Sequence, residues 1–263
     1  MQVLVYTLRE AVRILVLSDI HANLEALQAC LDAAPEFDMV FNLGDIVGYG
    51  ACPNEVTARV RDMGSIFVRG NHDKACTGLE STDGFNPIAE RAVTWTQQQL
   101  SADNLEFLRA LPAGPVSPLE NMQCVHGSAR DEDEYIVVAR EAYPLLIETT
   151  VRLTFFGHTH IQCGFAANND AEVFHVLVPR YQSSRREPER ETVHLDGNEK
   201  YLINPGSVGQ PRDNDPRAAF AFYDTEEDAL TFFRIPYDIA AAQKKILAAG
   251  LPGRLASRLA EGL

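Results

Sequence analysis

Residues 13–23 read RILVLSDIHAN, a short apolar run that breaks abruptly into polar side chains. The run has the length of a β-strand, and its continuous apolar character is typical of a strand buried on both faces. Four later segments repeat the design: residues 39–45 (MVFNLGD), 65–73 (SIFVRGNHD), 122–127 (MQCVHG) and 152–160 (RLTFFGHTH). Each segment places histidine, aspartate or asparagine directly after a predicted strand.

The stretches between these strands have helical patterns. Helices are predicted from residue 24, where leucines recur at 24, 27 and 31, and over residues 54–63, 87–100 and 102–111. Strands that alternate with helices predict an α/β layered fold. Beyond residue 160 the pattern changes to strands at 172–179, 191–195, 200–203, 218–224 and 229–235, followed by a helical end at 237–262. This half predicts a mostly antiparallel sheet packed on the first, with a surface loop over residues 180–191.

The length of 263 residues suits a single domain over residues 1–263. Residues 1–12 precede the first predicted strand and could be an N-terminal extension. Residues 74–120 separate the third and fourth motifs. Their helices are either a lid over the site or a simple packing layer on the flank of the sheet.

The composition, with 46% hydrophobic and 23% charged residues, predicts a globular protein. The formal charge of -14 argues against strong binding to nucleic acid or to anionic membranes. No apolar stretch approaches the ~18 residues of a membrane span, and the N-terminus does not resemble a signal peptide, so we expect a cytoplasmic location. Five cysteines without a CxxC motif predict free thiols in a reducing compartment.

Taken singly, each strand-end motif is weak. Asp19-Ile20-His21 could start a helix, Gly44-Asp45 could form a turn, and Asn71-His72-Asp73 could form a self-bonded loop. Together the five motifs are informative, because the ends of neighbouring strands meet at one edge of a sheet. That edge would gather Asp, Asn and His side chains in the mixture that suits transition metals.

The order DxH, GD, GNHD, HG, GHTH resembles the calcineurin-like metallophosphoesterase superfamily, and within it the small bacterial YfcE-like phosphodiesterase branch. The resemblance covers residues 13–160 and continues less specifically to residues 204–212 (NPGSVGQPR). It implies a four-layer α-β-β-α fold, in which two mixed sheets pack as a sandwich flanked by helices. It also implies hydrolysis of a small phosphodiester or phosphomonoester by attack of a hydroxide that bridges two metal ions.

The same resemblance implies a ligand set and a cofactor. The first ion would be bound by Asp19, His21 and His160, the second by Asn71, His126 and His158, and Asp45 would bridge them. The ions would be two divalent transition metals, with Mn favoured and Fe, Zn, Ni and Co as alternatives. His72 occupies the position that contacts phosphate and could protonate the leaving group.

The chain departs from the protein-phosphatase pattern GDxxDRG, because Gly48 and Gly50 replace its second aspartate and its arginine. The orienting partner of His72 is therefore unknown, and Arg130 or Arg212 could supply the phosphate contact instead. A small diester is the preferred substrate. A nuclease on the same site and a non-catalytic scaffold of the same fold are the alternatives, and a homo-oligomer is left open.

Overall fold

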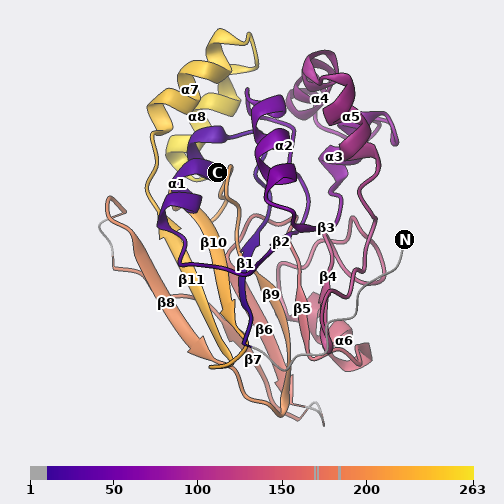
Figure 1. Ribbon diagram of the computed structural model, residues 1–263, viewed down its shortest axis with the longest axis vertical. Coiled ribbons are helices and arrows are strands. Elements are labelled where there is room, and N and C mark those ends of the chain that lie inside the picture. Colours follow the sequence, from indigo (N-terminus) through magenta and orange to yellow (C-terminus); the bar gives the residue numbers. More distant parts are fainter. Residues whose placement is uncertain (1–10, 169, 171, 183–184) are drawn as a thin grey trace.

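The computed structural model describes residues 11–168, 170, 172–182 and 185–263 (Figure 1). Eleven strands form two mixed sheets within this part of the chain. The first sheet has the order β3 (Ile66–Phe67), β2 (Met39–Asn42), β1 (Arg13–Leu17), β10 (Ala218–Asp224), β11 (Ala229–Ile235), β8 (Glu189–His194). The second has the order β4 (Met122–Cys124), β5 (Leu153–Phe155), β9 (Glu199–Asn204), β6 (Cys163–Asn168), β7 (Phe174–Leu177).

Alternating side chains of β1 show how the layers form. Ile14 and Val16 face the second sheet and join a core with Phe41 and Phe155, whose ring centroids are 5.8 Å apart. Leu15 and Leu17 point the opposite way and pack beneath helices. A strand whose side chains alternate between two apolar layers must be apolar throughout, which explains the continuous run in the sequence.

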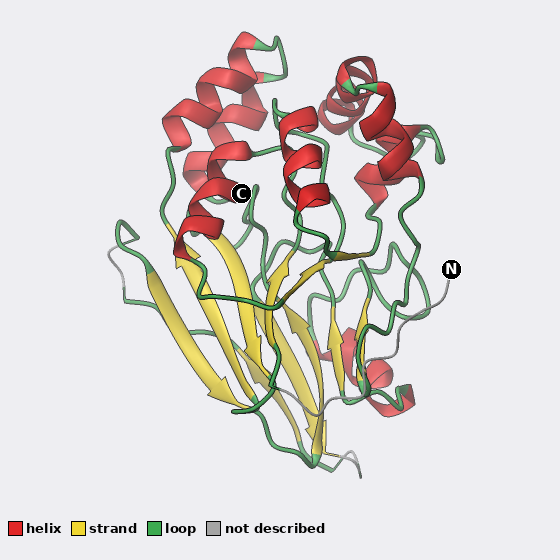
Figure 2. Ribbon diagram, in the orientation of Figure 1, coloured by secondary structure: helices red, strands yellow, loops and turns green. Residues whose placement is uncertain are grey.

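Helices cover the outer faces of both sheets (Figure 2). The first sheet carries α1 (Leu24–Ala33), α2 (Pro53–Asp62), α3 (Asn71–Thr77) and α5 (Ala102–Arg109), with α4 (Pro87–Gln99), α7 (Ile239–Ala248) and α8 (Gly253–Glu261) alongside. The second sheet packs on α6 (Ala139–Glu148). The predicted four-layer fold class is confirmed. Among the described residues, no helix has the length and apolarity that crossing a bilayer requires.

The second half of the chain does not form a sheet of its own, contrary to the sequence-based expectation. Strands β10, β11 and β8 instead extend the first sheet, because β1 pairs in parallel with β2 on one side and antiparallel with β10 on the other. Three elements were not predicted from the sequence: α3, α6 and β6. Helix α3 starts inside the Asn71-His72-Asp73 motif, which was interpreted as a loop. Helix α6 contains Pro144, a helix breaker, and β6 (CGFAAN) is poor in β-branched residues.

Two expectations fall wholly or partly outside the described residues. The proposed N-terminal extension includes residues 1–10, and the predicted surface loop includes residues 183–184. The loop was expected to continue to residue 191, but β8 already begins at Glu189.

All five cysteines are buried free thiols, in agreement with the sequence-based expectation.

The loops that follow the parallel strands lie against one another. The backbone N–H of Asp19 donates to the carbonyl of Gly44 at 3.0 Å, and that of His21 donates to the carbonyl of Asp45 at 2.9 Å. The N–H of Gly157 donates to the carbonyl of His126 at 2.8 Å in the second sheet. These backbone bonds hold the motif loops side by side.

Candidate metal centre

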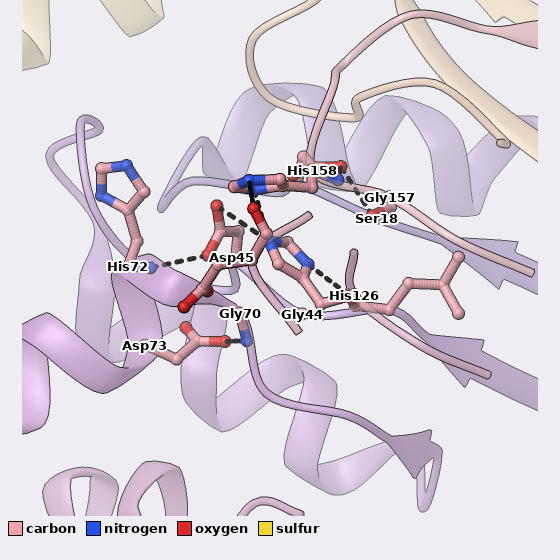
Figure 3. Close-up of polar contacts among 12 residues, drawn as sticks. Ser18, Gly44, Asp45, Gly70, His72, Asp73, His126, Gly157 and His158 are labelled. Atoms are coloured by element: carbon pink, nitrogen blue, oxygen red, sulfur yellow. Dashed lines mark hydrogen bonds and ion pairs between the residues drawn. The ribbon is translucent and has the colours of Figure 1, made fainter. Parts of the chain in front are cut away.

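Asp45 lies at the centre of a buried group of acidic and histidine side chains (Figure 3). One set of potential metal ligands comprises Asp19, His21, Asp45 and His160, and a second comprises Asp45, His126 and His158. All of these residues are almost completely buried. Asp45 belongs to both sets and is the one residue that they share.

Short distances link the two sets through Asp45. Its Oδ2 is 3.5 Å from His21 Nε2 and 3.6 Å from His126 Nε2. His160 Nε2 is 3.3 Å from Asp19 Oδ1. Six predicted ligand positions from four separate loops therefore converge within a few ångströms, and Asn71 from a fifth loop lines the same cavity.

Backbone carbonyls orient all four clustered imidazoles. The Nδ1–H groups of His21, His126 and His160 donate to the carbonyls of Val47, Leu43 and Gln210, at 3.1, 2.7 and 2.6 Å. The His158 ring has the opposite orientation: its Nε2 is 3.2 Å from the carbonyl oxygen of Asp133, and its Nδ1 faces inward. In each neutral imidazole the nitrogen that faces a carbonyl must carry the hydrogen. The other nitrogen therefore directs its lone pair at the centre of the cluster.

The inward nitrogens face each other in pairs. His21 Nε2 lies 3.1 Å from His160 Nε2, and His158 Nδ1 lies 3.1 Å from His126 Nε2. Two lone pairs at that distance repel each other unless a proton or a cation sits between them. Two buried oxygens have no hydrogen-bond partner and are further potential metal ligands: Asp19 Oδ1 and Asn71 Oδ1. The donor set of imidazole, carboxylate and amide oxygen thus fits divalent transition metals.

The electrostatics of the cluster agree with this fit. Burial alone would raise the pKa of Asp45, but positive charge on His126 and His72 outweighs it and holds that pKa well below the usual range. Burial opposes a charge on His126, yet Asp45 raises the pKa of this imidazole to about 10. Burial lowers the pKa values of His21 and His160 far below normal, which favours the neutral form that binds metals. A divalent cation would neutralise Asp45 in place of the proton on His126.

The ligand loops have unusual backbone conformations. Asp19, His21, Asp45, His158 and His160 have φ values of +52°, +49°, +54°, +66° and +60°. Left-handed conformations are unfavourable for residues with a Cβ, and their concentration at one place is typical of a functional site.

A glycine allows the close approach of two of these loops. A Cβ on Gly70 would lie 2.1 Å from Asp45 Oδ1. Asp73 then joins the loops, because Gly70 N–H and Val47 N–H donate to its two oxygens at 3.0 and 3.2 Å.

His72 lies beside the cluster, at the N-terminal end of α3. Its ring is 5.0 Å from that of His21 and 4.3 Å from that of Tyr49, between centroids. Its Nδ1 is buried without a hydrogen-bond partner, and a Cβ on Gly48 would lie 2.6 Å from that atom. Among the described residues, packing against aromatic rings therefore orients His72, and no carboxylate does so.

A cavity of about 310 Å³ opens beside the cluster. Arg212 lines it together with Asp45, Asn71, His72 and His158. The guanidinium lies 5.9 Å from the Tyr49 ring centroid, its Nε has no partner, and none of the described carboxylates forms an ion pair with it. Arg212 is therefore available to an anion in the cavity.

Arg130 lies away from this cavity, which corrects one of the two sequence-based expectations for a phosphate contact. Its Nε donates to Glu148 Oε2 at 2.8 Å, and its side chain lines a different cavity next to α6. A nearby carboxylate on α6 offers the guanidinium a closer partner than the metal cluster does.

The segment predicted as an insert contributes directly to the cavity. Glu80, Asp83 and Phe85, in the loop before α4, line it opposite Tyr135 of the β4–α6 loop. Phe85, Tyr135 and Tyr49 were not among the site residues predicted from the sequence. Tyr49 lies between Gly48 and Gly50, the two positions that depart from the protein-phosphatase pattern, and that departure was a signal. Phe85 and Tyr135 lie in stretches without a motif.

Comparisons with known proteins agree with this geometry. The family model described as "Calcineurin-like phosphoesterase superfamily domain" matches residues 12–228. The protein MJ0912 of Methanocaldococcus jannaschii, described as uncharacterized, is 36% identical over 255 residues, which are 94% of this chain and 96% of that protein.

Two solved structures also match over nearly the whole chain. A metallophosphoesterase from Sphaerobacter thermophilus is 40% identical, with a TM-score of 0.82 over 97% of this chain and 100% of the other. The hypothetical protein PH1004 from Pyrococcus horikoshii shares the fold at 18% identity, with a TM-score of 0.73 over 95% of this chain and 98% of the other.

Proposed function

The chain belongs to the calcineurin-like phosphoesterase superfamily, and from this premise we propose that it hydrolyses a small phosphodiester with two divalent metal ions. The observation that carries the proposal is the pairing of inward-facing imidazole nitrogens around one shared carboxylate. Such an arrangement suits two neighbouring cations and has no obvious purpose in a scaffold protein.

The proposed ligand sets follow the two clusters. Asp19, His21 and His160 would hold one ion, and Asn71, His126 and His158 the other, with Asp45 between them. Bound there, the ions would act as Lewis acids that activate a water molecule and neutralise charge on the phosphoryl oxygens. Manganese is our preferred ion, and iron, zinc, nickel and cobalt fit the same donors.

The remaining chemistry falls to residues that line the cavity. Arg212 would bind a phosphoryl oxygen, because its guanidinium lines the cavity beside the cluster and pairs with none of the described carboxylates. His72 would contact the phosphate and transfer a proton to the leaving oxygen. The Nδ1 atom of His72 has no hydrogen-bond partner. Packing against the Tyr49 ring must therefore hold the imidazole in place.

The preference for a diester rests on the number of cationic groups. Gly50 provides no side chain where the protein-phosphatase pattern has an arginine, so Arg212 stands alone among the lining arginines and lysines of the described chain. A diester carries one negative charge and a monoester about two near neutral pH, which favours the diester. The net charge of -14 disfavours nucleic acid as the substrate.

Metal analysis and turnover of bis-p-nitrophenyl phosphate with Mn²⁺ would test the proposal. We expect about two ions per chain and measurable diester hydrolysis that exceeds monoester hydrolysis. Asp45→Asn should lose at least 100-fold in kcat/KM, because the bridging carboxylate is replaced by a neutral amide, on the order of the losses that follow removal of a key catalytic group. Circular dichroism would check that the variant folds, and Glu261→Gln on the exposed surface of α8 is the matched control. Parental activity in Asp45→Asn would refute the bridging role.

A further inference from the structure

Two aromatic rings flank the candidate metal centre at separate places. Phe85 meets His72 edge-on, with centroids 5.1 Å apart, and Tyr135 lies over His158 with centroids 3.9 Å apart. His72 and His158 lie on different sides of Asp45 (Figure 3). The two rings therefore adjoin different histidines of the site, Phe85 next to His72 and Tyr135 next to His158.

Both rings are accessible from the cavity. Tyr135 is 52% exposed although it is a large aromatic side chain on a wall of the cleft. Phe85 is half-buried, with part of its ring packed against the core and part lining the cavity. A flat organic group could stack on each of them, since aromatic rings prefer offset or edge-on contacts with other planar groups.

Lys74 braces the walls that carry these rings. Its buried Nζ lies 2.9 Å from Glu80 Oε2, five residues before Phe85, and 2.6 Å from Asp133 Oδ2, two residues before Tyr135. One ammonium group thus links both walls of the cleft. The ion pairs hold the two rings at a set separation, which would favour substrates of matching width.

The charges around the cavity limit which substrate groups can lie beyond the candidate metal centre. Arg212 supplies positive charge next to the cluster. The outer walls carry carboxylates on Glu80, Asp83 and Asp133 instead. Lys74 supplies one positive charge to Glu80 and Asp133 together, so these walls keep a net negative charge. A single phosphate would be bound at the centre, whereas a second phosphate would meet negative charge.

Resting on the proposed phosphoesterase function, we propose that the substrate is a monoanionic phosphodiester with a flat, uncharged group on each ester oxygen. The leaving group stacks on Phe85, beside His72, which would protonate it. The retained group stacks on Tyr135, beside His158. The cleft thereby selects against polyphosphate chains and against diesters with charged side groups.

Two substrates with the same leaving group separate the roles of the rings. Bis-p-nitrophenyl phosphate carries an aromatic retained group, and methyl p-nitrophenyl phosphate carries a methyl group there. With Mn²⁺ present, Tyr135→Ala should lower kcat/KM roughly threefold to tenfold for the first ester only, the size of effect expected for one lost aromatic contact. Phe85→Leu, which keeps apolar bulk against the core, should lower kcat/KM for both esters.

Controls separate the ring from its surroundings. Tyr135→Phe keeps the ring and removes the hydroxyl, so it should preserve the ratio of kcat/KM between the two esters that Tyr135→Ala reduces. Val137→Ala changes the same loop at an exposed side chain outside the cavity and should behave as the parent. Calorimetric titration with diphenyl phosphate should show a comparable loss of affinity in Tyr135→Ala, independent of turnover. A carboxylate on the retained ring of the first ester should lower kcat/KM several-fold.

The results distinguish this inference from the proposed function. Equal losses for both esters in Tyr135→Ala, or none for either, would overturn the assignment of the rings while diester hydrolysis by the parent still stood. Failure of the parent to hydrolyse either ester would remove the proposed function and this inference with it.

Discussion

Gly48 and His72 form the contact in which this chain departs most from the protein-phosphatase pattern. Where that pattern has an aspartate, the chain has a glycine with φ of +91°, and the imidazole lies directly against it. The ring is then held by Tyr49 and Phe85. Shape and packing thus take over the orienting role that a carboxylate would otherwise have.

Substitution at Gly48 tests this account. In Gly48→Ala, the new Cβ would lie 2.6 Å from His72 Nδ1, so the ring must move. We expect kcat for the diester to fall at least tenfold, because a misplaced proton donor loses most of a 10²–10⁴-fold contribution. Metal content should not change, since His72 belongs to neither ligand set. Elemental analysis beside steady-state kinetics would check both, and loss of metal would contradict the assigned role.

At the scale of elements, the loop between β9 and β10 forms the side of the site that carries Arg212. It carries the Gln210 carbonyl that accepts from His160, and it carries Arg212. Two buried arginines hold its far end. Arg234 on β11 bonds Asp213. Arg217, which lies in the loop itself, bonds Asp215, with Nη2 to Oδ2 at 2.6 Å, and also donates to Glu189 on β8 at 2.6 Å. These ion pairs fix the loop against the first sheet.

Acid should weaken this anchor. Burial alone would raise the pKa of Asp215, but the bonds from Arg217 outweigh it and lower that pKa below the usual value near 3.8. The ionised group therefore stabilises the fold above about pH 4, and that contribution disappears as pH falls through the lowered pKa. Asp215→Asn should reduce the free energy of unfolding at pH 7 by about 1.5–3 kcal/mol, and the difference should shrink near pH 3.

Urea unfolding at both pH values would measure this difference. Glu261→Gln, which breaks an exposed pair with Arg254 on α8, should change the free energy of unfolding by less than about 1 kcal/mol. A gap between Asp215→Asn and the parent that stayed constant from pH 7 to pH 3 would show that ionisation of Asp215 contributes nothing.

At the scale of the whole molecule, the candidate metal centre joins the two sheets. Asp19, His21 and Asp45 follow strands of the first sheet, whereas His126, His158 and His160 follow strands of the second. Bound ions would therefore cross-link the two halves of the sandwich. They would also relieve repulsion between the facing imidazole nitrogens.

Removal of metal should destabilise the entire fold for this reason. Ligand at 100 times its Kd contributes about 2.7 kcal/mol to the free energy of unfolding, or roughly 5–10 °C in Tm for a chain of this size. A chelator should lower Tm by that amount in the parent and much less in Asp45→Asn. Differential scanning calorimetry with and without Mn²⁺ would measure it, and equal shifts in both proteins would exclude Asp45 as a shared ligand.

The sequence by itself determined the fold class, the superfamily and the loops that meet. Those features depend on local order: a buried strand must be apolar, and the polar residues of a motif follow it directly, as in residues 13–23 and 152–160. These features can be predicted from the sequence because each strand and the motif that follows it are adjacent in the chain.

Only the tertiary structure decided which side chains share one cavity and how each is turned. Arg130 and Arg212 look alike in sequence, yet a carboxylate on α6 binds the first while the second faces the cluster. His158 presents Nδ1 where three other imidazoles present Nε2, because its backbone partner lies on the opposite side of the ring. Phe85 and Tyr135 come from loops 50 residues apart. These relations depend on the distances between segments that are far apart in the chain. Packing determines those distances, and the local sequence does not.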